Sequence, residues 1–392
     1  MLSPVICAEA SFAVLRTSSR LPSRDASRAT PKCRKHAVRP SQRDILQEVR
    51  LSYSEEDVVT SPGSQGVNTP GALPNSLPSV GKAAEAPLLT VDSLRIYYHS
   101  VLGEYKVVDG ASLSVRPGEI FGLAGESGSG KSTLVDGVLR LIKPPGYVAG
   151  GQVLFRPGDS LNVTDNLPEM VDLLALAEGD LRRVRWKHMS YVPQGSMNAL
   201  NPVMRVRDQL TEGILAHTTM SAGEANAKAR EVLELVGLGR RVERLYPHEL
   251  SGGMKQRAVI ACAIALRPKL VMADEPTTAL DVNAQRAILQ LIHDLRRELG
   301  ITVLFVSHEM GVHAELVDRM AIMYAGEVVE IADVESIYIR PLHPYTQGLI
   351  GSIPHATGER KRLVGIPGMA PSALTWPEGC RFHPRCSRAM DI

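Results

Sequence analysis

The pattern of apolar and polar residues predicts that regular structure begins near Leu88. Two segments rich in β-forming residues, 91–98 and 105–115, flank a turn at Gly103. The simplest interpretation of these segments is an antiparallel hairpin. Residues 1–87 are rich in Ser, Pro, Arg and Ala and have no sustained periodicity, so we predict that they form a disordered N-terminal extension.

A second pattern predicts alternating strands and helices. The apolar run 120–124 ends in a glycine-rich loop, and apolar residues then recur at helical spacing up to Lys143. Apolar runs at 270–273 and 301–306 are joined by a helical pattern, which is typical of a βαβ unit in a parallel sheet. The predicted fold class is therefore α/β with a mostly parallel core sheet and an antiparallel β subdomain.

The remaining segments complete the predicted organisation. Helical patterning dominates 198–266, and a hairpin-like pattern returns at 320–330 around Gly326. From Pro341 onward the chain is punctuated by proline. We expect a main domain over 88–340, with a helical subdomain at about 198–266, and a C-terminal extension over 341–392.

Composition and charge exclude several classes of function. The 392 residues, 44% of them hydrophobic, suffice for one large domain or two modest ones. The 44 Lys and Arg against 42 Asp and Glu leave a net charge of +2, so we expect no nucleic-acid partner. No apolar stretch approaches the roughly 20 residues that span a bilayer. The chain is therefore predicted to be soluble and to reach a membrane only through a partner.

The cysteines and the N-terminal residues indicate the cellular compartment in which the protein works. The five cysteines form no close-spaced framework, and Cys262 lies inside an apolar run, so a reducing cytoplasm is expected. The arginine-rich, acid-poor start resembles a transit peptide. Plain disorder, or a start codon assigned too early, is favoured over a transit peptide, although the sequence leaves all three open.

The glycine-rich loop after the 120–124 run has the spacing of a P-loop, between a strand and a helix. Its backbone N–H groups and the helix N-terminus can surround phosphate oxygens. Lys131 would reach the β- and γ-phosphates, and Ser132 would offer a hydroxyl to Mg²⁺. The residues predicted to contact ATP here are Gly125, Glu126, Ser127, Gly128, Ser129, Gly130, Lys131, Ser132 and Thr133.

Acidic and imidazole side chains follow two of the predicted strands. Asp274 and Glu275 end the 270–273 run, where Asp274 can hold Mg²⁺ and Glu275 can orient or deprotonate the attacking water. His308 follows the 301–306 run at the same edge of the sheet, within reach of the γ-phosphate. Taken alone, each could be an ordinary polar residue at the end of a strand.

A second phosphate-binding helix N-terminus is predicted at 250–257, Leu-Ser-Gly-Gly-Met-Lys-Gln-Arg. Ser251 is placed to cap the helix, and Gly252 and Gly253 expose backbone N–H groups. Two phosphate cradles in one domain indicate two nucleotides shared between two copies.

This segment resembles the signature motif of the ABC ATPase family, and the resemblance extends over 89–353. It implies a P-loop NTPase fold in which the signature of one subunit closes over ATP held by the other. By the same resemblance Gln194 lies in the Q-loop and contacts Mg²⁺ or water, Asp281 lies in the D-loop and contacts the opposite subunit, and His308 is the switch histidine. An aromatic residue under adenine is also expected, with Tyr98 favoured over Tyr105, although an ordinary strand tyrosine fits almost as well.

The C-terminal part narrows the resemblance. Residues 340–346, Arg-Pro-Leu-His-Pro-Tyr-Thr, resemble the His-Pro-Tyr motif of oligopeptide, dipeptide and nickel importer ATPases, and other segments resemble the first of their two paralogous ATPases. This implies uptake of peptides or similar small solutes, or nickel. It further implies a paralogous ATPase partner, two permease subunits and an extracytoplasmic solute-binding protein, at the cytoplasmic face of the plasma membrane. An exporter ATPase, a soluble non-transport ABC ATPase and a non-hydrolysing scaffold subunit are the alternatives.

The tail around Cys380 and Cys386 resembles the cysteine-bearing end of the same family, where further cysteines complete an iron–sulfur site. Two thiolates do not supply the four ligands of such a cluster, and neither Cys7 nor Cys33 has a context that would complete it. The expected cofactors are therefore ATP and Mg²⁺, with a cluster only in a longer chain.

Overall fold

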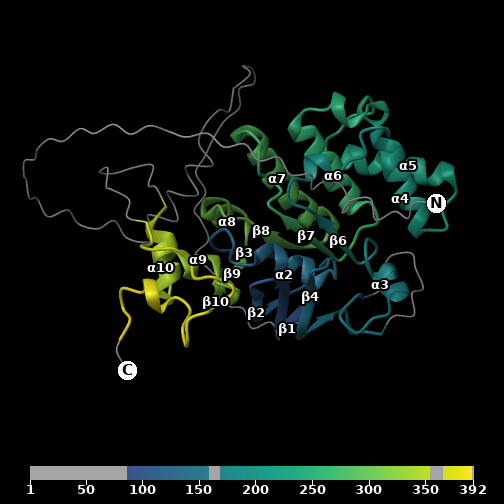
Figure 1. Cartoon of the computed structure of the whole chain (residues 1–392). Helices are drawn as coiled ribbons and strands as arrows, with labels where there is room; N and C mark the ends of the chain where they lie inside the picture. The colour runs from purple at the N-terminus through teal and green to yellow at the C-terminus, as the bar shows by residue number, and fades with distance from the viewer. Residues whose placement is uncertain (1–85, 159–167, 354–364, 391–392) are drawn as a thin grey trace, which may run out of the picture.

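The computed structural model describes residues 86–158, 168–353 and 365–390, and these form two sheets with helices around them (Figure 1). The prediction of disorder for 1–87 falls almost entirely outside the described residues. The predicted start of regular structure near Leu88 is confirmed, because the first strand begins at Leu89.

The first sheet is antiparallel and has the strand order β2-β1-β4-β5. β1 pairs with β2 from Leu89↔Val115 to Ser100↔Gly103, so the predicted hairpin around Gly103 is confirmed. Burial alternates along much of β1, as expected of a sheet that packs on the core with one face only. The strands are β1 Leu89–Ser100, β2 Gly103–Val115, β4 Gly146–Phe155 and β5 Val171–Asp172.

The second sheet has the order β10-β9-β3-β8-β7-β6, and its strands β9, β3, β8, β7 and β6 are parallel neighbours. β10 pairs with β9 as the predicted hairpin at Ala325 and Gly326. β3, β7 and β8 are buried along their whole length, which explains their continuous apolar runs. The strands are β3 Ile120–Ala124, β6 Met189–Val192, β7 Leu270–Asp274, β8 Thr302–Val306, β9 Arg319–Tyr324 and β10 Glu327–Asp333.

Helices cover the second sheet and extend beyond it. The predicted helical segment 198–266 contains α4, α5 and α6, which lie together on one side of the molecule in Figure 1. The predicted βαβ unit is β7, α7 and β8. The helices are α2 Lys131–Val138, α3 Glu178–Val184, α4 Val206–His217, α5 Ala222–Leu235, α6 Gly252–Ile264, α7 Val282–Leu299, α8 Met310–Leu316, α9 Val334–Ile339 and α10 Pro344–Gly351.

Two apolar cores lie on opposite faces of the central strands. On β3, Phe121 and Leu123 face the core shared with the antiparallel sheet and α2, whereas Ile120 and Ala124 face the core shared with α6, α7 and α8. The alternation follows from the two-residue period of a strand. α2 is thereby enclosed between the two sheets, and the loop before it is held on both sides.

The helix after the glycine-rich loop is shorter than the pattern predicts, since it ends at Val138 and not near Lys143. Arg140 has a φ of 53°, which breaks the helical path. The Arg185 guanidinium donates to the carbonyl oxygens of Leu139 and Arg140 at 2.7–3.0 Å and so satisfies the free end of the helix. The apolar residues beyond Val138 pack without being helical.

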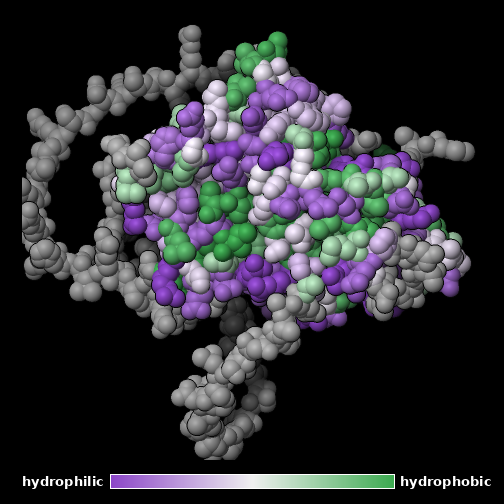
Figure 2. All heavy atoms as spheres, turned by 90° about the horizontal axis from the view of Figure 1, so that it is seen from below, coloured by the Kyte–Doolittle hydropathy of each residue, from purple (hydrophilic) through white to green (hydrophobic). Residues whose placement is uncertain are grey.

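Polar and apolar side chains are intermixed on the face shown in Figure 2, with a group of apolar ones near its centre. Such a mixture is ordinary for a folded protein. Within the described ranges, every helix is too short or too polar to cross a bilayer.

Candidate functional site

The carboxyl ends of β3, β7 and β8 meet at one edge of the parallel sheet. The loop 125–130 leaves β3, Asp274 and Glu275 end β7, and His308 follows β8 closely. Loops at this edge of an open parallel sheet are where such folds bind their ligands. The structure thus brings together the three groups of residues that the sequence places after strands.

Two glycines give the loop its shape. Gly125 has a φ of 148°, and a Cβ at this position would collide with the carbonyl oxygen of Met323. Gly130 has a φ of 99° at the N-cap of α2, and a Cβ there would lie 2.6 Å from the carbonyl oxygen of Val107. Only glycine fits both constraints. The loop can therefore turn tightly and present its N–H groups at the helix N-terminus.

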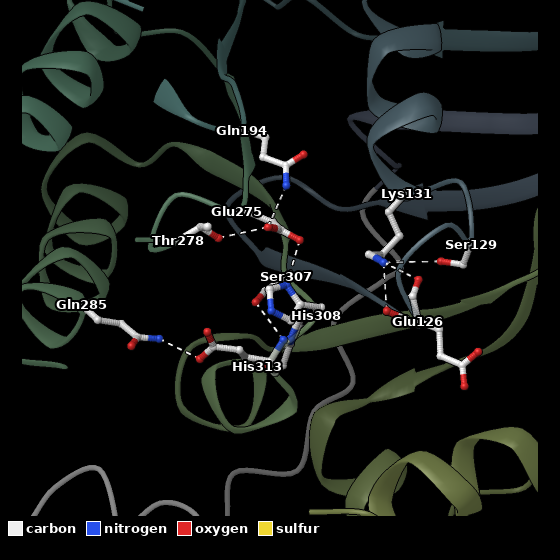
Figure 3. Close-up of polar contacts among 12 residues, drawn as sticks. Glu126, Ser129, Lys131, Gln194, Glu275, Thr278, Gln285, Ser307, His308 and His313 are labelled. Atoms are coloured by element: carbon white, nitrogen blue, oxygen red, sulfur yellow. Dashed lines mark hydrogen bonds and ion pairs between the residues drawn. The ribbon is translucent and has the colours of Figure 1, made fainter. Parts of the chain in front are cut away.

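Lys131, the first residue of α2, is the buried cation of the site. Its ammonium donates to the carbonyl oxygens of Gly125 and Glu126, each at 2.8 Å (Figure 3). Burial lowers the pKa of Lys131, whereas the nearby carboxylates of Glu275 and Asp274 raise it. The ammonium is thus held inside the loop, on the side where phosphate charge would need compensation.

Asp274 fits the role of a cation ligand. It is 1% exposed, and neither carboxylate oxygen has a partner at normal hydrogen-bond geometry among the described residues. Burial raises the pKa of Asp274 to about 6, against the lowering effect of the Ser132 hydroxyl. A buried carboxylate with free lone pairs next to a hydroxyl is an oxygen donor set that suits Mg²⁺.

Glu275 is surrounded by three polar side chains. The His308 Nδ1 lies 2.8 Å from its Oε1, and Gln194 and Thr278 each donate to its Oε2 at 3.0 Å. Figure 3 shows these side chains converging on the carboxylate from three different segments. Burial raises the pKa of Glu275, but the hydrogen bonds from His308 and Thr278 outweigh it, and the net pKa is lowered.

The position of Glu275 suits work on a water molecule. Its lowered pKa keeps the carboxylate ionised and able to accept a proton or orient a water. Its backbone φ of 48° is unusual for glutamate and turns the chain sharply after β7. His308 uses Nδ1 on Glu275 and is half exposed, so its Nε2 remains available to a ligand.

The predicted signature segment lies elsewhere in the fold. Ser251 caps α6 by accepting from the Met254 N–H at 3.3 Å, as predicted. α6 packs against α4, α5, α7 and β6, whereas α2 packs against β1, β2 and β7. The N-termini of α2 and α6 therefore lie in different parts of the fold, packed against different elements.

The other predicted contacts are placed as follows. Asp281 is exposed and caps α7 by accepting from the Ala284 N–H at 2.9 Å. Gln194 is brought to Glu275, and its role as a Mg²⁺ ligand stays a prediction. Tyr98 lies in β1 with its hydroxyl near Thr133 of α2, and burial raises its pKa. Tyr98 therefore lies beside the loop helix, and its contact with adenine also stays a prediction.

The contacts that several residues make at the site were not predicted from the sequence. Thr278 contacts Glu275, and Tyr191 of β6 lies between Asp136 and Asp274. Burial, together with these two carboxylates, raises the pKa of Tyr191. Only its position before Gln194 on a strand next to β7 could have indicated it. Tyr345 and Arg385 reach Glu126 from the C-terminal part of the chain, which no local pattern predicts.

Among the described residues, the fold brings no further metal ligands to the two C-terminal thiols. Cys380 is exposed and Cys386 is half-buried. Over 86–158, 168–353 and 365–390, no three His, Cys, Asp or Glu residues are grouped in a way that could hold a metal ion.

Comparison with known proteins gives matches to two family models and to many proteins. Residues 108–278 match the ABC transporter family, and residues 329–392 match the oligopeptide/dipeptide transporter C-terminal region. The oligopeptide transport ATP-binding protein AppD of Bacillus subtilis is 40% identical over 306 residues, which cover 78% of this chain and 90% of AppD. The OppD protein of Escherichia coli is 37% identical over 319 residues, which cover 81% of this chain and 90% of OppD.

A similar solved structure is a dimeric one of the ATP-binding cassette MJ0796 in a post-hydrolysis state with ADP and phosphate. It is 28% identical, has a TM-score of 0.53, and covers 63% of this chain and 98% of its own. The predicted P-loop NTPase fold of the ABC type is confirmed by this likeness. With the P-loop, the Asp274–Glu275 pair and His308 at one sheet edge, the chain belongs to the ABC transporter family, as an ATP-hydrolysing ATP-binding protein of its oligopeptide/dipeptide group.

Proposed function

We propose that this chain is the ATPase subunit that powers uptake of peptides or similar small solutes through partner permeases, at the cytoplasmic face of the plasma membrane. The observation that carries the ATPase part of this proposal is the position of Glu275, which three polar side chains contact and whose carboxylate interacts with Lys131. The match of residues 329–392 to an oligopeptide/dipeptide transporter region supports import over export. In this proposal 88–340 is the nucleotide-binding domain and 341–392 its extension.

The residues of the site divide the chemistry between them. Lys131 and the N–H groups of its loop compensate the charge of the β- and γ-phosphates. Glu275 holds the attacking water, and His308 contacts the γ-phosphate through the nitrogen that Glu275 leaves free. Ser132 and Asp274 would hold Mg²⁺, which when bound supplies charge neutralisation at the phosphate oxygens.

The import function can be tested with the partner permeases that this proposal requires. The complex is reconstituted in vesicles with its solute-binding protein, and ATP hydrolysis and peptide uptake are measured together. Hydrolysis that rises when peptide-loaded binding protein is added, with uptake lost in the Glu275→Gln complex, is the expected result. Peptide efflux, or hydrolysis indifferent to permease and binding protein, would contradict the proposal.

We further propose that each active site forms between two ATPase subunits. α6 and α2 pack on different parts of the fold, so the two phosphate cradles serve different nucleotides. The resemblance to the first of two paralogous ATPases supports a heterodimer, in which each site combines one P-loop with the partner's signature.

Gly253→Asp is the substitution that tests this arrangement. A Cβ at Gly253 would lie an ordinary 3.5 Å from the Ala284 Cβ, so this chain can accommodate a side chain there. The added carboxylate would face the γ-phosphate held by the partner, a like-charge contact that costs several kcal/mol. We expect hydrolysis at the partner's P-loop to fall by about 100-fold or more, while ATP binding at Lys131 is retained.

The measurement is photolabelling of each subunit with an azido-ATP analogue after trapping of the hydrolysed nucleotide, in the reconstituted complex. Gly253→Asn is the matched control, because it adds the same volume without the charge. Loss confined to this chain's own P-loop would show that the cross-subunit arrangement is wrong. Equal loss at both sites of a complex holding two copies of this chain would contradict the heterodimer.

A further inference from the structure

The C-terminal part of the chain folds back onto the P-loop through an aromatic cluster. Tyr345 of α10 and Phe382 pack against Tyr324 at the end of β9, with ring centroids 4.5 Å and 5.3 Å from that of Tyr324. Tyr345 and Phe382 are 5.4 Å apart, and all three rings are buried. Packing of these buried rings fixes the position of the C-terminal segment that contains Phe382 and Arg385.

Arg385 extends from this cluster to the P-loop. Its guanidinium makes two parallel contacts with the Glu126 carboxylate, at 2.9 Å and 3.1 Å. The Arg385 side chain is only 6% exposed, and its guanidinium lies over the rings of Tyr324 and Phe382. The hydrogen bonds to Glu126 raise the pKa of Arg385. A bidentate, largely buried pair of this kind is stronger and more directional than a surface ion pair.

Tyr345 holds the backbone of the same residue. Its hydroxyl accepts from the Glu126 N–H at 2.8 Å, while the Glu126 carbonyl accepts from Lys131. Figure 3 shows the Glu126 side chain pointing away from the Lys131 ammonium. Glu126 is thus held by its N–H and carboxylate from the C-terminal side, and by its carbonyl from the nucleotide side.

Arg381, also in the C-terminal part of the chain, stabilises the other end of the P-loop indirectly. Arg381 is 8% exposed and donates to the carbonyl oxygen of Ala325 at 2.6 Å and to Asp109 at 2.7 Å. The neighbouring Gly326 N–H donates to the carbonyl oxygen of Ser129 at 3.0 Å. The C-terminal residues therefore contact the P-loop directly at Glu126. They also contact the β9–β10 turn, which in turn holds Ser129.

We propose that Arg385 and Tyr345 are positioning residues for nucleotide binding, which hold the P-loop through Glu126 in the shape that receives the phosphates. Neither residue touches the nucleotide in this proposal. A loop fixed in advance loses less conformational freedom on binding, so removing the support weakens affinity. The inference rests on the proposed nucleotide site at Lys131, and it makes nucleotide affinity depend on a segment 259 residues further along the chain.

The test compares Arg385→Gln, Arg385→Lys, Glu126→Gln and the Arg385→Gln/Glu126→Gln double variant in the full chain. Dissociation constants for ATP and ADP are measured with fluorescent analogues, and the KM and kcat of hydrolysis are measured in the complex. We expect Arg385→Gln to raise the dissociation constants of ATP and ADP, and the KM for ATP, by about 10-fold. The kcat at saturating ATP should be nearly unchanged. Arg385→Lys, which keeps the charge but loses the fork, is expected to lie between Gln and wild type.

Two further measurements separate positioning from a purely structural role. The double variant is expected to bind no more weakly than either single variant, because the two residues act through one contact. Arg388→Gln, on the exposed surface of the same segment, is the control and is expected to bind like wild type. If Arg385→Gln does not fold, Glu126→Gln alone still tests the contact, because it removes the other partner of the same ion pair.

Wild-type affinity and KM in both Arg385→Gln and Glu126→Gln would overturn the proposal. So would additive losses in the double variant, or a fall in kcat with no change in KM. Failure of the underlying site has a different result: Lys131→Ala would then bind ATP normally, whatever Arg385 does.

Discussion

Replacing Lys131 with Ala is expected to lower ATP affinity by about 100-fold or more and to abolish measurable hydrolysis. The ammonium is the buried cation of the loop, and its charge-assisted hydrogen bonds to phosphate are worth about 1.5 to 3 kcal/mol each. Two such bonds, to the β- and γ-phosphates, account for the expected loss. Isothermal titration with ATP and Mg²⁺ measures it directly.

Lys131 also donates to Gly125 and Glu126, so the variant must be examined for damage to the fold. Thermal unfolding without nucleotide measures that contribution separately. Lys269→Ala is the control, because Lys269 is exposed just before β7. Unchanged nucleotide affinity and hydrolysis in Lys131→Ala would remove the P-loop assignment.

Replacing Glu275 with Gln is expected to retain ATP binding while turnover falls by about 100- to 10,000-fold. The amide keeps the shape of the side chain, and its oxygen can still accept from Gln194 and Thr278. The negative charge that would orient or deprotonate water is lost. Because binding survives without hydrolysis, the variant should accumulate as an ATP-bound dimer.

Phosphate release measures the turnover, and light scattering with ATP measures the dimer. Glu298→Gln makes the same change at an exposed position on α7 and serves as the control. Normal phosphate release in Glu275→Gln would exclude Glu275 from its role. A parallel loss of ATP affinity would mean that the carboxylate supports the site and does not act on water.

The chemistry of the site could be predicted because its parts are local. A glycine-rich loop between a strand and a helix is one continuous segment, and so is the apolar run that ends in Asp274 and Glu275. Parallel strands place their carboxyl ends at one sheet edge, so His308 could be expected near both. The hairpins at Gly103 and Gly326 follow from turn residues in the same way.

Other features depend on contacts between distant segments. The helix after the P-loop was expected to continue to Lys143, but Arg185 holds its end near Leu139. The ionised state of Glu275 depends on His308 and Thr278, and the raised pKa of Asp274 depends on how completely it is buried. Spacing along the chain does not report burial or the side chains that surround a charge.

The sequence by itself determined the fold class, the order of the elements and the identity of the phosphate-binding loop, because each rests on periodicity and turn chemistry within a short segment. Only the tertiary structure decided which side chains surround Glu275, and that Tyr345 and Arg385 hold Glu126. The His-Pro-Tyr segment could be linked to a family from its letters, yet its contact with the P-loop could not. The physical reason is that such contacts form when two packed layers bring remote residues together, and no local propensity encodes the pair.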